Sequence, residues 1–247
     1  MRNVKLTLAY DGTNYHGFQE QRGSGLLTIQ EVLESTLQKF TGRRVIVYGA
    51  GRTDAGVHAL GQVVNFDASH WPIPIPRIPL ALNGALPGDI VIKEAEEVPE
   101  NFHARFSAIN KTYCYQIYNQ RIPDPFYARY SYFEPRELSL SAMQEAAGYL
   151  LGQHDFAAFR AQGTPVKSTV RTIYHLAVER TGCLIRITIK GDGFLYNMVR
   201  IIAGTLLQVG LGKYPPQTMP GILASRQRSL AGPTLPPQGL FLVRVDY

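Results

Sequence analysis

A lone carboxylate in a glycine-rich loop is the first feature of this sequence that could do chemistry. Asp54 lies two residues after Arg52, and small residues fill most of the positions around both, from residue 49 to residue 56. Because glycine and alanine leave space beside the backbone, another molecule could approach Asp54 closely. An ionised carboxylate in such an opening can act as a nucleophile or as a general base. The same side chain can also cap its own backbone in a turn, and the loop alone leaves both interpretations open.

Arg200 is a second candidate because it is a cation in a segment with almost no polar face. Residues 198–204 are otherwise apolar or small, and they lie in a helix predicted over residues 196–209. A charged side chain in such a helix must either extend to solvent or meet an opposite charge. An ion pair with Asp54 would satisfy both groups and keep the carboxylate ionised.

Tyr113 is a third candidate. It belongs to residues 111–118, whose aromatic and β-branched content predicts a strand. In that strand Lys111, Tyr113, Tyr115 and Ile117 would share one face. A tyrosine among strand aromatics ordinarily packs in a core, so its functional interpretation depends on the motif around it.

These segments resemble the motifs of one enzyme family. Residues 51–58, which read Gly-Arg-Thr-Asp-Ala-Gly-Val-His, closely resemble the signature of the TruA-type tRNA pseudouridine synthases. Residues 111–115 resemble the Lys-x-Tyr-x-Tyr element of that family, and residues 197–200 resemble its arginine motif. The chain departs from the pattern at Phe241, where relatives often carry tyrosine. Further matches lie in both halves of the chain, at residues 10–12, 17–19, 86–89, 103–107, 171–173 and 238–240.

The resemblance implies a homodimeric enzyme that converts uridine to pseudouridine at positions 38–40 of the tRNA anticodon arm. It assigns catalysis to Asp54 and pairs that carboxylate with Arg200. It implies that Tyr113 stacks on the target base, and it makes Tyr113 a candidate for a late proton transfer. Leu240, in the matched segment 238–240, is expected to bind substrate.

This isomerisation breaks the C1′–N1 bond of uridine, rotates the uracil and joins C1′ to C5. None of these steps requires a metal or a redox cofactor, so we expect neither. Asp54 could attack the base, attack the sugar or remove a sugar proton, and the sequence leaves all three open. Because the base must leave its stack, a side chain must fill the vacated space, and Arg52 is close to Asp54 in the chain. Candidates for phosphate contacts are Arg43, Arg44, Lys167, Arg171 and Arg186.

The first elements of the chain are a strand and a helix. Residues 4–10 alternate at period two and end in a turn, which predicts the strand. Thr28 and Glu31 have capping-box spacing, which predicts that a helix begins there, and Gly42 lies just beyond its end. The expected inward stripe of that helix is Ile29, Val32, Leu33, Thr36, Leu37 and Phe40.

The Asp54 loop is expected to connect two strand-like runs, residues 45–48 and 62–66. The proline-rich residues 71–79 predict a loop. A short helix over residues 81–86 and a strand over residues 90–95 are expected to end the first half.

The second half again runs from strand to helix to strands. A helix capped by Ser139 or Ser141 is expected to stop at Gly152. Residues 171–180 and 183–190 predict a hairpin in which alternate isoleucines of the second strand face the core. A short helix over residues 218–224 and a closing strand over residues 240–247 follow. The expected inward residues of the first helix are Leu140, Met143, Ala147, Leu150 and Leu151.

Together these elements predict an α+β fold of two similarly built subdomains, each a mainly antiparallel sheet with helices on one face. Residues 1–100 would carry the catalytic Asp54 loop. Residues 101–247 would carry the tyrosine strand and the arginine helix. We expect the active-site cleft between the two subdomains.

Composition favours a nucleic-acid partner. The formal net charge is +6 and the pI is about 9.3. This charge favours binding to a polyanion but does not identify which one. The chain lacks a run of about 18 apolar residues and an N-terminal signal-peptide pattern, so we expect a cytoplasmic protein without membrane segments. Cys114 and Cys183 are expected to pack without forming a zinc site.

Two other classes of protein fit parts of this pattern. A non-catalytic RNA-binding protein would have the same basic balance and exposed aromatic residues. A hydrolase such as a glycosidase ordinarily needs two nearby carboxylates, and residues 49–66 offer only Asp54. Asp11 or Asp192 could supply the second carboxylate only through the fold.

Overall fold

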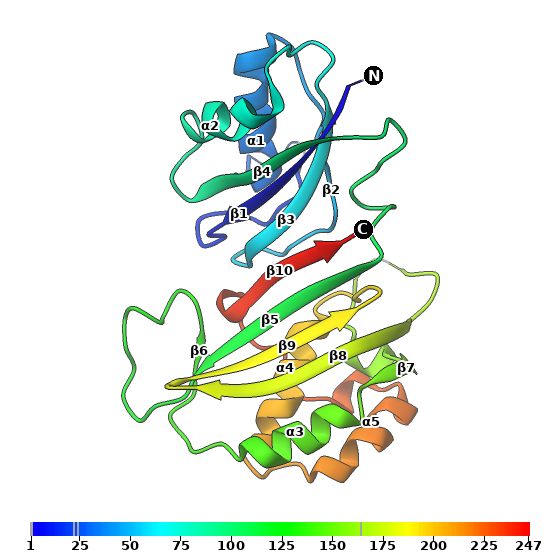
Figure 1. Cartoon of the computed structure of the whole chain (residues 1–247). Helices are drawn as coiled ribbons and strands as arrows, with labels where there is room; N and C mark the ends of the chain where they lie inside the picture. Colours follow the sequence, from blue (N-terminus) through cyan, green and yellow to red (C-terminus); the bar gives the residue numbers. More distant parts are fainter. Residues whose placement is uncertain (1, 22, 24, 164) are drawn as a thin grey trace. The chain divides into compact units, whose positions relative to one another are not determined.

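The computed structural model describes residues 2–247 except residues 22, 24 and 164. The chain divides into two compact units (Figure 1). The first unit comprises Met1–Ile109 together with Phe241–Tyr247, and the second comprises Asn110–Leu240. Both units combine strands with helices, and the predicted α+β fold is confirmed. In the described part of the chain, no helix has the length and apolar character needed to cross a membrane.

The first unit is built on a mixed sheet with the strand order β4-β1-β3-β10 and with β2 paired to β3. β1 pairs antiparallel with both β3 and β4, and β10 pairs parallel with β3. In β1 the alternating residues Val4, Leu6 and Leu8 are fully buried, as the period-two pattern predicts. The strands are β1 (Asn3–Tyr10), β2 (Tyr48–Gly49), β3 (His58–Asp67), β4 (Ile90–Val98) and β10 (Leu240–Asp246).

Helix α1 (Ile29–Thr41) begins and ends where its sequence predicts. Both halves of the capping box form, since the Thr28 hydroxyl accepts from the backbone N–H of Glu31 and the Glu31 carboxylate accepts from that of Thr28. Gly42 closes the helix in the left-handed conformation. Ile29, Leu33, Thr36 and Leu37 are buried, whereas Val32 is half-buried and Phe40 is exposed at the end of the stripe.

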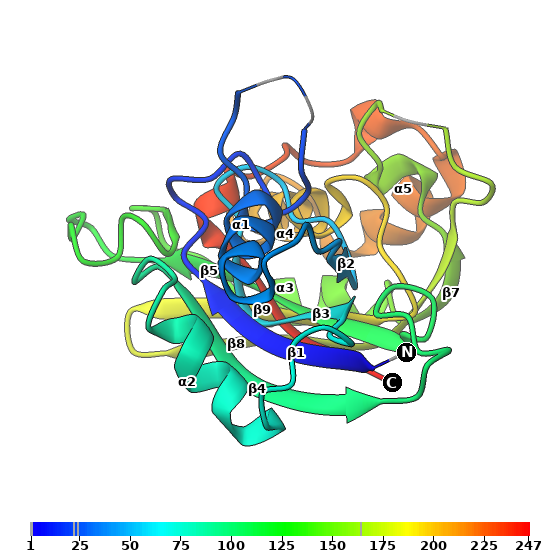
Figure 2. The same ribbon diagram turned by 90° about the horizontal axis from the view of Figure 1, so that it is seen from above.

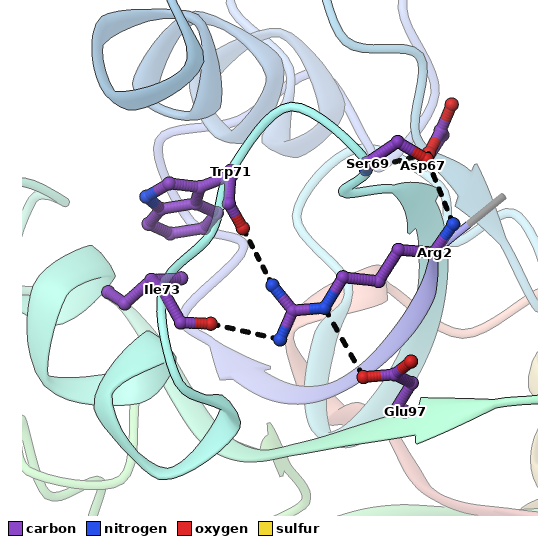
Figure 3. Close-up of polar contacts among 6 residues, drawn as sticks. All are labelled: Arg2, Asp67, Ser69, Trp71, Ile73 and Glu97. Atoms are coloured by element: carbon purple, nitrogen blue, oxygen red, sulfur yellow. Dashed lines mark hydrogen bonds and ion pairs between the residues drawn. The ribbon is translucent and has the colours of Figure 1, made fainter.

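Arg2 holds the proline-rich connection that follows β3 (Figure 3). Its guanidinium donates to the carbonyl oxygens of Trp71 at 2.6 Å and Ile73 at 2.9 Å. Its Nε lies 3.2 Å from a carboxylate oxygen of Glu97 on β4. Trp71 is buried and its ring stacks on Phe40 of α1, with centroids 5.4 Å apart. An irregular segment is thus fixed to the sheet through its own carbonyl groups.

The second unit has the strand order β5-β9-β8-β7, all antiparallel, with β6 paired parallel to β5. Helix α3 packs on β8 and on α4, and α4 packs on β5, so the two helices cover the same face of the sheet (Figures 1 and 2). The strands are β5 (Asn110–Tyr118), β6 (Tyr132–Phe133), β7 (Gly152–Asp155), β8 (Val170–Thr181) and β9 (Leu184–Gly191). The helices are α3 (Leu140–Gly148), α4 (Met198–Gly210) and α5 (Met219–Ser225).

The predicted hairpin is confirmed as β8 and β9. Ile185, Ile187 and Ile189 are fully buried, as their alternation predicts. Helix α4 is buried on almost every side, which is the usual position of a helix that is apolar all round.

Several element boundaries differ from the sequence prediction. β3 begins at His58 because its first residues pair with β1 and β10. Of the preceding run, residues 45–48, only Tyr48 lies in a strand, which is β2. Helix α2 (Ile78–Asn83) begins earlier than predicted, because Pro79 occupies a first-turn position that needs no N–H donor. Helix α3 begins after Ser139, its N-cap, but ends at Gly148, so Leu151 lies beyond it and is 43% exposed instead of inward.

The division into units also differs from the predicted boundary at residue 100. Residues 101–109 pack with the first unit, where the side-chain amide of Asn3 donates to the carbonyl of Phe102 at 2.9 Å. The end of the chain joins the same unit, because Phe241 and Leu242 pair with the start of β3.

Candidate active-site loop

The loop that carries Asp54 connects β2 to β3 in the first unit. β2 ends at Gly49 and β3 begins at His58, so the loop comprises residues 50–57. Within it, the Arg52 side chain is exposed, Thr53 is buried and Asp54 is partly exposed. The buried residue therefore attaches the loop to the unit, while its two neighbours reach solvent.

A buried network of polar side chains holds Thr53. Its Oγ1 lies 2.7 Å from the Tyr10 hydroxyl, with either group able to donate. Gln62 on β3 donates from Nε2 to the carbonyl oxygen of Gly51 at 2.9 Å and, more weakly, to the Tyr10 hydroxyl at 3.5 Å. Burial raises the pKa of Tyr10 to about 12, so the hydroxyl stays protonated at neutral pH. The network fixes the backbone on the N-terminal side of Asp54.

The turn that follows β1 fixes the loop from the other side. The Phe18 N–H donates to the carbonyl oxygen of Thr53 at 3.0 Å, and the Gly56 N–H donates to that of Tyr15 at 3.3 Å. The Val57 N–H donates to the carbonyl oxygen of Asp54 at 3.1 Å and closes a turn around the carboxylate-bearing residue. The loop is thus connected to residues 15–18 before any substrate binds.

Glycine is required where these two segments touch. Gly17 has φ +92°, and a Cβ there would lie 2.7 Å from the carbonyl oxygen of Thr53. A Cβ on Gly12 would overlap the carbonyl oxygen of Val57. Glycine is therefore needed in the matched segments 10–12 and 17–19 because the backbone of the Asp54 loop approaches them closely.

His58 joins the end of the loop to the same turn. Its Nδ1 lies 3.1 Å from the Gly12 nitrogen and 3.1 Å from Oδ1 of Asp11. The imidazole is almost fully buried and stacks on Phe241 with ring centroids 4.8 Å apart. Phe241, where the sequence departs from the family pattern, thus packs its ring on His58.

In the second unit, Tyr113 lies on β5 opposite Ile189 of β9. Most of its surface is buried, and its ring meets Phe194 edge to face with centroids 5.1 Å apart. The neighbouring Tyr115 donates its hydroxyl to the carbonyl oxygen of Pro236 at 2.8 Å, and burial raises the pKa of Tyr115 well above its usual range. β5 therefore presents Tyr113 beside a tyrosine that anchors residues 235–240.

Arg200 anchors the same segment. Its Nε donates to the carbonyl oxygen of Leu235 at 2.6 Å, and its Nη1 donates to Oδ1 of Asn197 at 2.8 Å. Asn197 has φ +59°, an unusual conformation for a residue other than glycine. Arg200 belongs to the second unit and Asp54 to the first, and their ion pair stays a prediction.

The last predicted substrate-binding residue, Leu240, follows this anchored segment and is buried. Gly239 lies against the ring of Tyr115, where a Cβ would come within 2.7 Å of Cζ. The structure therefore connects Arg200 and Leu240 through one short stretch of chain, residues 235–240. Tyr113 lies on the same strand as the tyrosine that supports this stretch.

Three residues that position the loop were not predicted from the sequence, namely Thr53, Gln62 and His58. Thr53 and His58 lie inside the matched signature, which is the signal that could have found them. Gln62 joins the network only because β3 pairs with β1, and neither its type nor its spacing indicates this role. Among the candidate phosphate contacts, Arg43, Arg44 and Lys167 are exposed, and Arg171 and Arg186 are half-buried.

Cys114 and Cys183 are both free, the former buried and the latter half-buried. Among the described residues, no group of three or more His, Cys, Asp or Glu side chains is arranged to hold a metal ion.

Comparison with known proteins links this geometry to one family. A family model described as tRNA pseudouridine synthase matches residues 7–107 and 146–247. A protein of Acetivibrio thermocellus named tRNA pseudouridine synthase A is 50% identical over 247 residues, which cover all of both chains. A protein of Thermoanaerobacter pseudethanolicus with the same name is 48% identical, again over the full length of both chains.

Among solved structures, one titled "Structure of H/ACA RNP bound to a substrate RNA containing 2'-deoxyuridine" has 9% sequence identity and a TM-score of 0.36. The match covers 83% of this chain and 53% of that one, so this chain spans about half the length of that protein. At this TM-score the likeness carries no argument.

Substituting Gly17 tests whether close packing holds the loop. Gly17→Ala is expected to destabilise the protein by about 1–3 kcal/mol more than Gly152→Ala, because overpacking against fixed backbone costs that much. Gly152 is the matched control, since its φ of +91° imposes similar backbone strain but the nearest atom to a Cβ there, Nε2 of His154, is 3.9 Å away. Urea unfolding of both variants measures the difference, and equal losses of stability would contradict the packing account.

Proposed function

Because the chain belongs to the tRNA pseudouridine synthase family, we propose that it forms pseudouridine at positions 38–40 of the anticodon arm, with Asp54 as its catalytic carboxylate. The enzyme is an isomerase that acts on uridine in tRNA. The target positions and the roles of individual residues form the proposal.

The observation that carries the assignment of Asp54 is its partly exposed position in a loop that is held on both sides. A catalytic group works best when its neighbours fix it before substrate binds. The Tyr10–Thr53 contact and the Phe18–Thr53 hydrogen bond do this from two different segments. The glycine and alanine residues around Asp54 leave room for a nucleotide.

The reaction needs one group that can act as a nucleophile or base, and no external atoms. The C1′–N1 bond of uridine breaks, the uracil rotates and C1′ bonds to C5, after which the proton on C5 leaves and N1 gains a proton. An ionised Asp54 can begin this sequence by attacking the base, by attacking the sugar or by removing a sugar proton. Tyr113 stacks on the target base in our proposal and is the candidate for the late proton transfer.

Arg52 and Arg200 have separate roles in the proposal. Arg52, exposed two residues before Asp54, fills the space left by the flipped uridine and binds the backbone beside it. Arg200 pairs with Asp54 in the working enzyme and keeps the carboxylate ionised. Leu240 lines the substrate site beside the segment that Arg200 and Tyr115 anchor.

The charge distribution supports tRNA binding mainly by the second unit. Residues 110–240 hold 14 of the 25 Lys and Arg residues but only 7 of the 19 Asp and Glu residues. The first unit is close to neutral, with 11 basic and 12 acidic residues. Phosphate contacts from the basic unit would dominate affinity and make it fall steeply with salt. We further propose that the enzyme works as a homodimer in the cytoplasm, without a metal or another cofactor.

Mapping pseudouridine in an unmodified tRNA transcript tests the proposed function. The wild-type protein should form pseudouridine at positions 38–40, and Asp54→Asn should fold and bind tRNA without turnover. Retention of a tenth or more of the wild-type rate by Asp54→Asn would remove the carboxylate from the central role. Tight binding by the wild-type protein with no product would favour the non-catalytic RNA-binding alternative.

The pairing of Arg200 with Asp54 predicts a change in the pH dependence of the reaction. Removing the cation in Arg200→Met favours the protonated carboxyl, so the acidic limb of the pH–rate profile should move to higher pH. Arg200→Lys is the matched control, because it keeps the charge and should leave that limb nearly in place. An acidic limb that stays unchanged in Arg200→Met would separate Arg200 from the chemistry of Asp54.

A further inference from the structure

The first unit displays a row of aromatic rings that the chemistry at Asp54 does not use. The row consists of Tyr48, His103 and Phe106, with Arg105 beside it. The His103 centroid lies 5.0 Å from that of Tyr48 and 4.4 Å from that of Phe106, and the Arg105 guanidinium lies 5.7 Å from the Phe106 centroid. Phe106 is 77% exposed and Tyr48 is 44% exposed, so the two ends of the aromatic row face solvent.

The turn that presents the row is closed by its own hydrogen bonds. The His103 N–H donates to Oγ of Ser107 at 3.1 Å, and the Ser107 N–H donates to the carbonyl oxygen of His103 at 2.9 Å. The Arg105 N–H donates to Nδ1 of His103 at 3.1 Å, which fixes the imidazole as an acceptor at that nitrogen. The exposed ring of Phe106 therefore stands on a short turn that is already ordered.

Ala104 anchors this turn to the sheet of the first unit. It is fully buried, and its N–H donates to Oδ1 of Asn65 at 2.8 Å. Its carbonyl oxygen accepts a hydrogen bond from the Tyr247 hydroxyl at 2.8 Å. Asn65 is itself buried and donates to Oδ1 of Asn3 on β1 at 3.0 Å. The N–H and the carbonyl group of Ala104 are thus both hydrogen-bonded to the core, while Arg105 and Phe106 project outward.

An exposed phenylalanine on an ordered turn adds little to folding, since its ring stays in water. Such a ring suits a ligand that stacks on it, because the turn is ordered before binding and little conformational entropy is lost when the ligand binds. Aromatic rings flanked by arginine are a common platform for the bases of unpaired nucleotides. The aromatic row also adjoins the catalytic loop in the chain, because Tyr48 lies two residues before it.

We propose that the aromatic row is a stacking site for an unpaired base of the tRNA substrate, with Phe106 as its principal surface. The inference rests on the proposed function for the identity of the RNA. The first unit has no excess of positive charge, so we expect stacking to add to the few phosphate contacts that its own arginines can make. The second unit supplies most of the electrostatic part.

The test compares Phe106→Ala with a matched control in the same unit. Leu80 on α2 is 76% exposed, so Leu80→Ala removes an apolar side chain of equal exposure away from the aromatic row. Phe106→Ala should weaken binding of an unmodified tRNA transcript about tenfold, within the usual range for one stacked base. Phe106→Trp should bind like the wild type, and Leu80→Ala should be unaffected.

The salt dependence of binding separates stacking from charge. The slope of log affinity against log salt should be the same for Phe106→Ala and the wild type, because no phosphate contact is lost. The proposal would be overturned if Phe106→Ala bound tRNA with wild-type affinity, or if Leu80→Ala lost as much affinity as Phe106→Ala. It would also be overturned if the salt slope of Phe106→Ala were shallower than that of the wild type. A parallel loss of self-association, measured by analytical ultracentrifugation, would assign the row to a protein contact and would also overturn it. Failure of the proposed function would look different, because the wild type and Leu80→Ala would then both form no pseudouridine.

Discussion

The contact between residues 12–18 and the Asp54 loop is the constraint on which the geometry of the candidate active site depends. Gly12 and Gly17 approach the backbone of the loop so closely that a Cβ at either position would meet a carbonyl oxygen. The hydrogen bond from the Phe18 N–H to the Thr53 carbonyl crosses the same contact. Because β1 leads directly into these residues, the position of Asp54 is set by the pairing of β1 with β3. The residue that we propose as catalytic is thus fixed by the fold of the first unit.

The second unit uses a comparable arrangement around residues 235–240. Arg200 and Tyr115 each donate to a main-chain carbonyl oxygen of this stretch, at 2.6 Å and 2.8 Å. Gly239 is needed because the chain lies directly on the Tyr115 ring. In both units polar side chains thus bind the backbone of a short segment next to the residues assigned to the reaction. These contacts stabilise a local conformation, and a hydrogen bond of this kind contributes about 1 kcal/mol.

Local signals were enough to predict some of this structure and not the rest. The Thr28–Glu31 capping box and the alternating isoleucines of β9 determine their elements from nearby residues, and both predictions are confirmed. The start of β3 at His58 was missed, because it depends on β1 and β10 as pairing partners. For the site, the signature identified Arg52 and Asp54 as candidates, whereas the role of Gln62 arises only from strand pairing.

Amide hydrogen exchange in the free enzyme tests most directly whether the Asp54 loop is held before substrate binds. The N–H groups of Phe18, Gly56 and Val57 donate to carbonyl oxygens of the loop or of the turn against it. If the loop is held as described, these amides should exchange within about tenfold of the rate of central β3 amides such as Val64, a difference near 1.4 kcal/mol. Exchange a hundredfold or more faster would mean that the loop opens locally, and would contradict the account in which the fold holds Asp54 in place before substrate binds.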